Sequence, residues 1–254
     1  MNARSAVAKG TESAAIRAPQ LVLCELGPDA HGLESLSPFC LKVHRALKFH
    51  GLDYERRYAI RPSEHRKHNP LGQVPVLLIE GEPVADSTAI LQALEDLTDK
   101  SLLPLDRRQL AIAWLWEDYA DRVLGYYVFA ARWFDDRNWS ALADEQFRPL
   151  PALLKPWMPN LIRSRILKKM SAMEFIRVGQ AGCWRMFQQH LDRLDDCAPE
   201  ECFWVGDKVT VADIGLFGVL HCLRSEISPW QMQEINRRPR LRAWLDRVDL
   251  ITRA

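Results

Sequence analysis

The sequence predicts two domains, a mixed α/β domain followed by an all-helical one. Strand-like apolar runs alternate with helix-like segments between residue 20 and about residue 100. After "TDKSLLPLD" no strand-like alternation follows, and long helical periodicities continue to the C-terminus. We therefore expect the α/β domain over residues 20–100 and the helical domain over residues 105–254.

The composition is typical of a globular protein, because 48% of the 254 residues are hydrophobic and 26% are charged. The formal net charge of +1 gives no general attraction to nucleic acid, so we expect no such partner. No apolar run approaches the about 20 residues of a membrane span. The six cysteines lack zinc-ligand spacing, and a chain of this size needs no disulfides. We therefore expect no metal site and a reducing, cytoplasmic location.

The first 19 residues are rich in Ala, Ser and Arg. This bias is weakly typical of a transit peptide, but the apolar block of a secretory signal is missing. We expect a disordered tail over residues 1–19.

The elements of the first domain follow the order β-α-β-(α)-β-β-α. "QLVLCEL" (20–26) predicts a buried strand, and a turn-rich loop leads to a helix from Ser37 to His50. Ser37 suits the N-cap, Pro38 suits the first helical position and Gly51 ends the helix. "YERRYAI" predicts a second strand, "SEHRKHN" a short turn, "VPVLLIE" and "EPVAD" a hairpin, and "STAILQALEDL" a helix.

The second domain begins with one long helix candidate, "RRQLAIAWLWEDYADRVLGYYVFAARWF", which has a broad apolar face. Three prolines between residues 150 and 160 interrupt the helical pattern, and further helices follow to the end of the chain. "VTVADI" places Thr210 three residues before Asp213, the spacing of a reciprocal helix cap. We assign this pair to folding and not to the active site.

Four local matches resemble the cytosolic glutathione transferase superfamily, in which a thioredoxin-like domain precedes an all-helical domain. "SPFC" (37–40) resembles the active-site helix of the serine and cysteine classes. "NPLGQVPVL" (69–77) is similar to the loop whose cis proline, here Pro75, presents backbone groups to glutathione. "ADSTAI" (85–90) is similar to the acidic-Ser pair that receives the γ-glutamyl group, and "TVADI" (210–214) matches the cap of the central helix. The likeness covers residues 20–250.

The resemblance implies that Ser37 is the catalytic residue and stabilises the glutathione thiolate. The unpaired N–H groups and positive dipole at a helix N-terminus favour an anion, and a hydroxyl donor adds to that effect. No nearby base is legible that could make Ser37 a nucleophile, and the alternative is a plain N-cap. We expect Cys40, one turn into the helix, to pack as a small hydrophobe. A redox role for Cys40 stays open if its thiol is exposed.

The resemblance also implies a glutathione site. A cis Val74–Pro75 bond would turn the Val74 backbone outward to pair with the cysteinyl part of the peptide, although a trans proline at a strand start is the alternative. The acidic-Ser pair would hold the charged groups of the γ-glutamyl moiety, or could simply cap its helix. The implied glutathione-binding residues are Gln73, Val74, Pro75, Asp86 and Ser87. Four basic residues compete for the glycine carboxylate: Arg61, His65, Arg66 and Lys67.

The second substrate implied by the resemblance is a small hydrophobic electrophile. By similarity to the serine-type transferases, its site would be lined by Phe39, Tyr119, Val123 and Tyr126. Core packing explains the apolar stripe of the long helix equally well. The family resemblance further implies a homodimer.

One loop departs from the common pattern of the superfamily. The loop from Gly27 to Leu36 is longer than in most transferases, and "SPFCLKV" after it also resembles the metaxin and failed-axon-connections branch. The basic segment from Arg163 to Lys169 could contact anionic lipid, but a solvated helix face is favoured. We expect a glutathione-dependent transferase without a metal. The alternatives are a non-catalytic binding or scaffold protein and a thiol reductase that uses Cys40.

Overall fold

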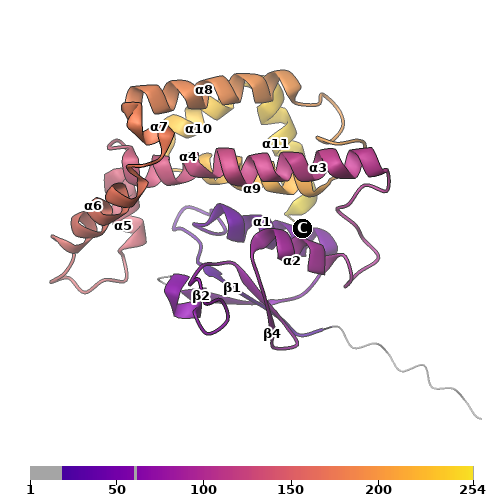
Figure 1. Ribbon diagram of the computed structural model, residues 1–254, viewed down its shortest axis with the longest axis horizontal. Helices are drawn as coiled ribbons and strands as arrows, with labels where there is room; N and C mark the ends of the chain where they lie inside the picture. Colours follow the sequence, from indigo (N-terminus) through magenta and orange to yellow (C-terminus); the bar gives the residue numbers. More distant parts are fainter. Residues whose placement is uncertain (1–18, 60–61, 254) are drawn as a thin grey trace, which may run out of the picture.

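The computed structural model describes residues 19–59 and 62–253. The expected tail lies outside the described residues except for its last position, and so does Arg61, one of the candidates for the glycine carboxylate. Figure 1 shows a small sheet with its helices on one side of the molecule and a larger group of helices on the other. The predicted fold class, a thioredoxin-like domain followed by an all-helical domain, is confirmed.

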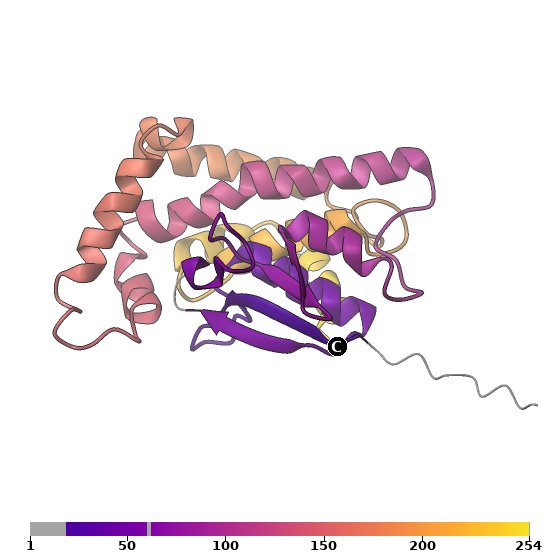
Figure 2. The same cartoon turned by 60° about the horizontal axis from the view of Figure 1, so that its bottom comes forward.

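The sheet has four strands in the order β2-β1-β3-β4. They are β1 (Leu21–Leu26), β2 (Glu55–Ala59), β3 (Val76–Ile79) and β4 (Glu82–Ala85). β1 pairs with β2 in parallel, whereas β1–β3 and β3–β4 are antiparallel. The parallel pair needs a crossover connection, which α1 (Pro38–His50) supplies, and β3 and β4 form the predicted hairpin. Figure 2 shows the same arrangement with the sheet turned toward the viewer.

Local sequence signals determine where α1 begins and ends. Ser37 is its N-cap, Pro38 occupies the first turn, and Gly51 ends the helix with φ 71°, a left-handed conformation that glycine adopts at little cost. α1 and α2 (Ser87–Leu94) bury apolar side chains against one face of the sheet. This core includes Leu23, Leu47, Leu77, Ile90 and Leu91. The short 3₁₀ helix η1 (Pro62–His65) follows β2.

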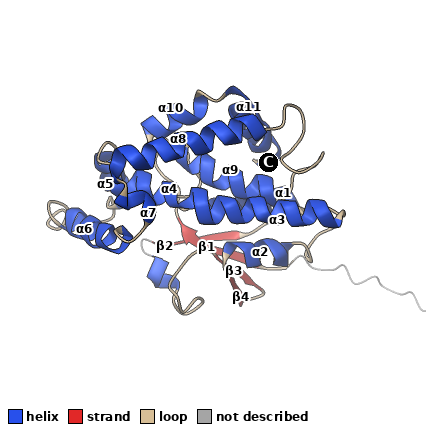
Figure 3. Ribbon diagram, turned by 45° about the horizontal axis from the view of Figure 1, so that its top comes forward, coloured by secondary structure: helices blue, strands red, loops and turns tan. Residues whose placement is uncertain are grey.

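The predicted long helix of the second domain is one continuous helical run (Figure 3). It contains two π-helical stretches. α3 (Arg107–Tyr119) passes into the π-helical stretch η2 (Ala120–Leu124), and α4 (Gly125–Phe129) passes into a second π-helical stretch, η3 (Ala130–Phe134). A π turn holds more residues than an α turn. The side chains that follow each π turn therefore face a different direction from the one that a uniform helix predicts.

The remaining helices complete the domain. They are α5 (Trp139–Gln146), α6 (Met158–Met170), α7 (Glu174–Arg177), α8 (Gly179–Cys197), α9 (Val211–Leu223), α10 (Pro229–Asn236) and α11 (Pro239–Thr252). The Thr210 N–H donates to Oδ2 of Asp213 at 2.9 Å, which is half of the reciprocal cap that the sequence predicts for α9. Within the described ranges, none of the helices has the length and apolar character needed to cross a lipid bilayer.

The central helix α9 packs directly along α1 and so joins the two domains. Gly218 makes this close approach feasible, because a Cβ atom at that position would lie 3.0 Å from the Pro38 carbonyl oxygen and 3.2 Å from Cβ of Lys42. The contact fixes the first turn of α1, which carries Ser37, against the helical domain.

Candidate active site

A cavity of about 720 Å³ lies between the two domains. The N-terminal domain contributes the start of α1, the loop before β3 and the start of α2, and the helical domain contributes residues of η2, α4, η3, α5 and α6. Seven residues predicted from the sequence line this one cavity, namely Ser37, Phe39, Gln73, Val74, Pro75, Asp86 and Ser87. The structure therefore brings the predicted serine, the predicted glutathione-binding residues and Phe39 together.

Ser37 is placed by the start of α1, and 7% of its surface is exposed. Its Oγ atom accepts a hydrogen bond from the Cys40 N–H at 3.3 Å, so the plain N-cap role is real. A hydroxyl has one hydrogen to donate and two lone pairs with which to accept. Accepting the cap bond does not use the hydroxyl hydrogen, which can donate either to the neighbouring Cys40 thiol or to a bound thiolate, so the two alternative roles of Ser37 are compatible.

Cys40 is fully buried below Ser37. Burial raises the pKa of the Cys40 thiol to about 12, although hydrogen bonding by Ser37 favours the thiolate slightly. A thiol with so high a pKa is almost entirely protonated near neutral pH and reacts slowly as a nucleophile. This placement supports the packing role and speaks against the thiol-reductase alternative.

The loop before β3 is held by a side chain that the sequence interpretation did not single out. Asn69 donates from Nδ2 to the Gln73 carbonyl at 3.1 Å and accepts the Leu71 N–H at 3.1 Å. An Asn that begins a Pro-Leu-Gly turn is a common turn former, so a signal for Asn69 was present. The Val74–Pro75 peptide bond is cis, as predicted.

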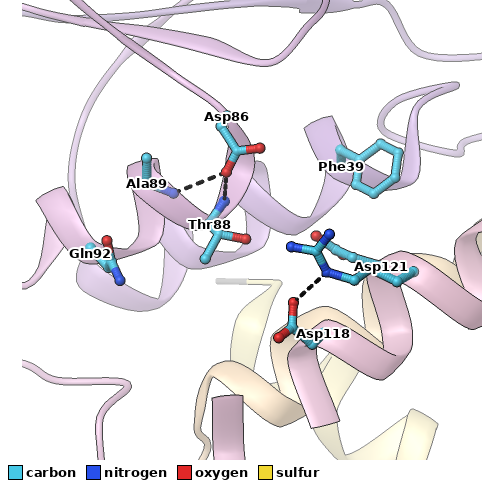
Figure 4. Close-up of a pocket in the computed structure, with 8 residues that line it drawn as sticks. Phe39, Asp86, Thr88, Ala89, Gln92, Asp118 and Asp121 are labelled. Carbon is cyan, nitrogen blue, oxygen red and sulfur yellow. Dashed lines mark hydrogen bonds and ion pairs between the residues drawn. The ribbon is translucent and has the colours of Figure 1, made fainter. Parts of the chain in front are cut away.

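Asp86 has a backbone conformation that is rare for residues other than glycine, with φ 84°. Its Oδ1 atom accepts the N–H groups of Thr88 at 2.9 Å and Ala89 at 3.2 Å, which caps α2. Figure 4 shows this cap beside a second cavity of about 540 Å³. Strained backbone of this kind is concentrated at functional sites, and Asp86 and the buried Ser87 both face the larger cavity.

A buried ionic cluster adjoins this end of the cavity, and the sequence interpretation missed it. Lys42 Nζ lies 2.6 Å from Oε1 of Glu117 and 2.6 Å from Oδ2 of Asp121. Asp121 lines both cavities, and its Oδ1 atom is buried without a hydrogen-bond partner. Burial raises the pKa of Asp121 to about 6, against the lowering effect of Lys42. Lys42 lies 75 and 79 positions before its two partners, too far for a spacing motif.

The structure corrects the prediction for the hydrophobic-substrate site. Tyr119, Val123 and Tyr126 do not line the cavity; the Tyr119 hydroxyl lies 2.6 Å from Nδ1 of His190, and Tyr126 is 41% exposed. The π stretch Ala120–Leu124 turns Tyr126 away from the face that a uniform helix would share with Tyr119. Tyr119 precedes this stretch and packs toward His190 of the helical domain instead. The apolar wall of the helical domain is formed by Val128, Phe129, Trp133 and Ile166.

The expected partner of the glycine carboxylate is not among the described lining residues. His65, Arg66 and Lys67 do not line the cavity. Burial lowers the pKa of His65, and the Arg66 side chain packs against Gly72. The basic residue that does line the cavity is Arg132, which the sequence interpretation did not select.

Comparison with known proteins agrees with this geometry. The family described as "Glutathione S-transferase, N-terminal domain" matches residues 36–97, and the one described as "Glutathione S-transferase, C-terminal domain" matches residues 162–247. Over 226 residues the chain is 26% identical to isoprene-epoxide–glutathione S-transferase of Rhodococcus sp. (strain AD45), covering 86% of this chain and 94% of the relative. Over 251 residues it is 27% identical to protein LigF of Sphingobium sp. (strain NBRC 103272 / SYK-6), covering 90% and 89%.

Two further comparisons complete this picture. A crystal structure of a glutathione S-transferase from Methylobacterium radiotolerans in complex with glutathione sulfonate has the same fold, with a TM-score of 0.59, 24% identity and coverage of 91% and 90%. The failed axon connections protein of Drosophila melanogaster is 28% identical over 77% of this chain and 49% of its own length. The likeness to that branch expected from "SPFCLKV" is thus present as well. With both domain families matched in order and the site residues gathered in one cavity, the chain belongs to the glutathione S-transferase superfamily.

Proposed function

We propose that this chain is a glutathione-dependent transferase whose Ser37 stabilises the glutathione thiolate for attack on an apolar electrophile. The observation that carries the proposal is the position of Ser37 at the N-terminus of α1, where it lines a cavity that has both polar and apolar side chains. The relative named isoprene-epoxide–glutathione S-transferase supports the same chemistry.

Glutathione would lie along the polar wall. Val74 would offer its backbone to the cysteinyl part of the peptide, while Asp86 and Ser87 would hold the charged groups of the γ-glutamyl part. Gln73 and the neighbouring Pro75 would complete this wall. This placement brings the glutathione sulfur to Ser37 at the helix N-terminus.

The thiolate is the reactive form, and the helix N-terminus and the Ser37 hydroxyl both favour it. Lowering a thiol pKa from about 8.5 to about 6.5 requires roughly 2.7 kcal/mol of preferential thiolate stabilisation. The thiolate then attacks an electrophilic carbon, the S–C bond forms, and the leaving group departs with its electron pair. Phe39 and the apolar wall of the helical domain exclude water from the electrophile.

Binding to immobilised glutathione, followed by conjugation of 1-chloro-2,4-dinitrobenzene, tests the proposal. We expect elution by free glutathione and turnover well above the uncatalysed rate. Retention without turnover would support the non-catalytic alternative, whereas absence of retention would refute the glutathione site. We also propose that the chain is cytoplasmic and forms a homodimer. Light scattering tests the homodimer, because a dimer has twice the mass of one chain.

A further inference from the structure

The two walls of the cavity differ in their side chains. The N-terminal domain supplies Asp86 and several polar groups among apolar residues, and the helical domain supplies four apolar side chains together with Asp121, Arg132 and Gln146. Among the described residues that line the cavity, Arg132 is the one basic residue. It lies in η3, next to Trp133 and one turn after Val128 and Phe129.

Arg132 lacks the partner that a buried guanidinium ordinarily has. Its Nη1 atom donates to the Leu36 carbonyl, while Nη2 is buried and makes no hydrogen bond. In the part of the chain that the structure describes, no carboxylate lies within ion-pair distance of Arg132. Asp29 and Cys222 act to raise the pKa of Arg132, but burial outweighs them and lowers it.

Other partly buried arginines of the protein are neutralised by carboxylates. Arg45 pairs with Glu34 and with Asp249, and Arg163 pairs with Asp136. An unpaired charge in an apolar environment is costly, and a ligand that supplies the opposite charge recovers that cost on binding. Among the described residues, Arg132 thus has no directly ion-paired carboxylate; Asp29, whose Oδ2 atom is also buried without a hydrogen-bond partner, acts on it from beyond ion-pair distance.

We propose that Arg132 binds a carboxylate carried by the electrophilic substrate, so that the preferred second substrate is an apolar electrophile with an acidic group. This inference rests on the proposed function. Arginine suits the role because its planar guanidinium matches a carboxylate with two parallel hydrogen bonds. Nη2 is the donor for which the described part of the protein supplies no acceptor, and the proposal requires this buried atom to turn toward the cavity when the substrate binds.

Glutathione also carries carboxylates, but its predicted partners lie on the opposite wall. Val74, Asp86 and Ser87 belong to the loop before β3 and the start of α2, whereas Arg132 belongs to η3, adjoins Trp133 and reaches the Leu36 carbonyl next to Ser37. The electrophile, and not glutathione, is therefore the substrate that lies against Arg132. A rise in the KM for glutathione alone on loss of Arg132 would contradict this assignment.

A matched pair of electrophiles tests the proposal, namely 4-(chloromethyl)benzoate and its neutral methyl ester. In both, the glutathione thiolate attacks the benzylic carbon, the S–C bond forms, and chloride leaves with the C–Cl electron pair. The two probes differ in the acidic group and not in the reacting centre. The ratio of their kcat/KM values, each corrected for the uncatalysed rate, measures selectivity for the carboxylate.

We expect the wild-type protein to prefer the carboxylate by about 10-fold to 100-fold, the range of one charge-assisted hydrogen-bonded contact. Arg132→Met keeps the length of the stem and removes the charge, so the preference should disappear while the ester is still turned over. Arg132→Lys should retain part of the preference. Arg148→Met, which removes an exposed arginine paired with Glu145, should keep the wild-type ratio.

Two results would overturn the proposal: a wild-type protein that turns over the ester and shows no preference for the carboxylate, or a preference that survives in Arg132→Met. If neither probe nor 1-chloro-2,4-dinitrobenzene is conjugated, the transferase function itself fails. Because Arg132 also holds the Leu36 carbonyl, thermal unfolding of each variant shows whether a lost preference reflects a lost fold. If Arg132→Met does not fold, Arg132→Lys decides: a folded Arg132→Lys protein with a reduced preference for the carboxylate supports the proposal, and a wild-type preference contradicts it.

Discussion

Nζ of Lys42 lies 2.6 Å from Oε1 of Glu117, and both side chains are 1% exposed at the boundary between the two domains. The Thr88 hydroxyl donates to the same carboxylate oxygen at 2.6 Å. The Glu117 carboxylate of α3 thus contacts both α1 and α2, the two helices whose N-cap residues are Ser37 and Asp86. The relative positions of the proposed thiolate site and the γ-glutamyl site depend on this buried cluster.

Lys42→Met should destabilise the protein strongly, because it leaves the carboxylates of Glu117 and Asp121 without their cation. Removal of one partner from a buried ion pair costs about 3–5 kcal/mol, which urea denaturation can measure. Arg122→Met is the matched control, since Arg122 pairs with Asp118 on the exposed side of the same helical run, and we expect no measurable change. Equal midpoints for the two variants would show that the cluster does not hold the domains together.

Asp121 should make stability depend on pH between about pH 4 and pH 6. Burial raises the pKa of Asp121 from 3.8 to about 6, so in this window the folded protein binds a proton that the unfolded chain releases. The free energy of unfolding therefore falls as the pH rises through the window. Asp121→Asn should remove this contribution. Since burial also raises the pKa of Glu25 to about 6, the measured quantity is the difference between the two proteins, and identical pH profiles would argue against the assignment.

Ser37→Ala should leave glutathione binding nearly intact, because Val74, Asp86 and Ser87 would make most of the contacts. The variant should raise the pKa of the bound thiol and slow turnover. Loss of one donor to such a charge is worth about 2–4 kcal/mol, or roughly 30-fold to 1,000-fold in rate. A pH–rate profile of conjugation measures both effects, and wild-type values would assign Ser37 to helix capping alone. Ser37→Thr, which retains a hydroxyl and a cap, should keep part of the rate.

Cys40→Ala should affect stability and not turnover. The lost packing of a small buried side chain costs on the order of 1 kcal/mol. In the folded wild-type protein, Cys40 should resist alkylation by iodoacetamide at pH 8, because its pKa is about 12, while the exposed Cys197 and Cys202 are accessible to the reagent. Peptide mapping measures the alkylation of each cysteine directly. Rapid labelling of Cys40 together with loss of activity in Cys40→Ala would restore the thiol-reductase interpretation.

Asp86→Asn separates the two roles of Asp86. Asparagine keeps an oxygen that can cap α2 and tolerates a positive φ, so the stability should change little. The negative charge is lost, and the affinity for glutathione should fall about 10-fold or more if the carboxylate holds the γ-glutamyl ammonium. Calorimetric titration with glutathione measures the change. Unaltered affinity in a stable variant would restrict Asp86 to capping.

The sequence was sufficient for the fold and for the polar wall of the cavity, because these depend on short local signals. Ser37, Pro38 and Gly51 mark the ends of α1 through their own backbone preferences. The loop that contains Pro75 and the helix start at Asp86 are contiguous segments, and a resemblance of a few residues locates each of them. Helix ends and loops that depend on residues adjacent in sequence can therefore be predicted from the sequence.

The apolar wall and the ionic cluster depend on contacts between distant segments. Lys42 and Glu117 are 75 positions apart, and either alone has the appearance of an ordinary surface charge. Arg132 likewise gains its significance because no carboxylate among the described residues forms an ion pair with it in three dimensions. No periodicity or spacing contains that information.

The π-helical stretches Ala120–Leu124 and Ala130–Phe134 make the acceptor wall sensitive to the length of the chain as well as to its side chains. Each residue of an α-helix advances the helix by about 100°, so deletion of a single residue from the first stretch would turn everything after it by that angle. Val128 and Trp133 would then leave the cavity, and other side chains would replace them. A one-residue deletion or insertion here is therefore a route to a new acceptor preference that leaves the thiolate site unchanged.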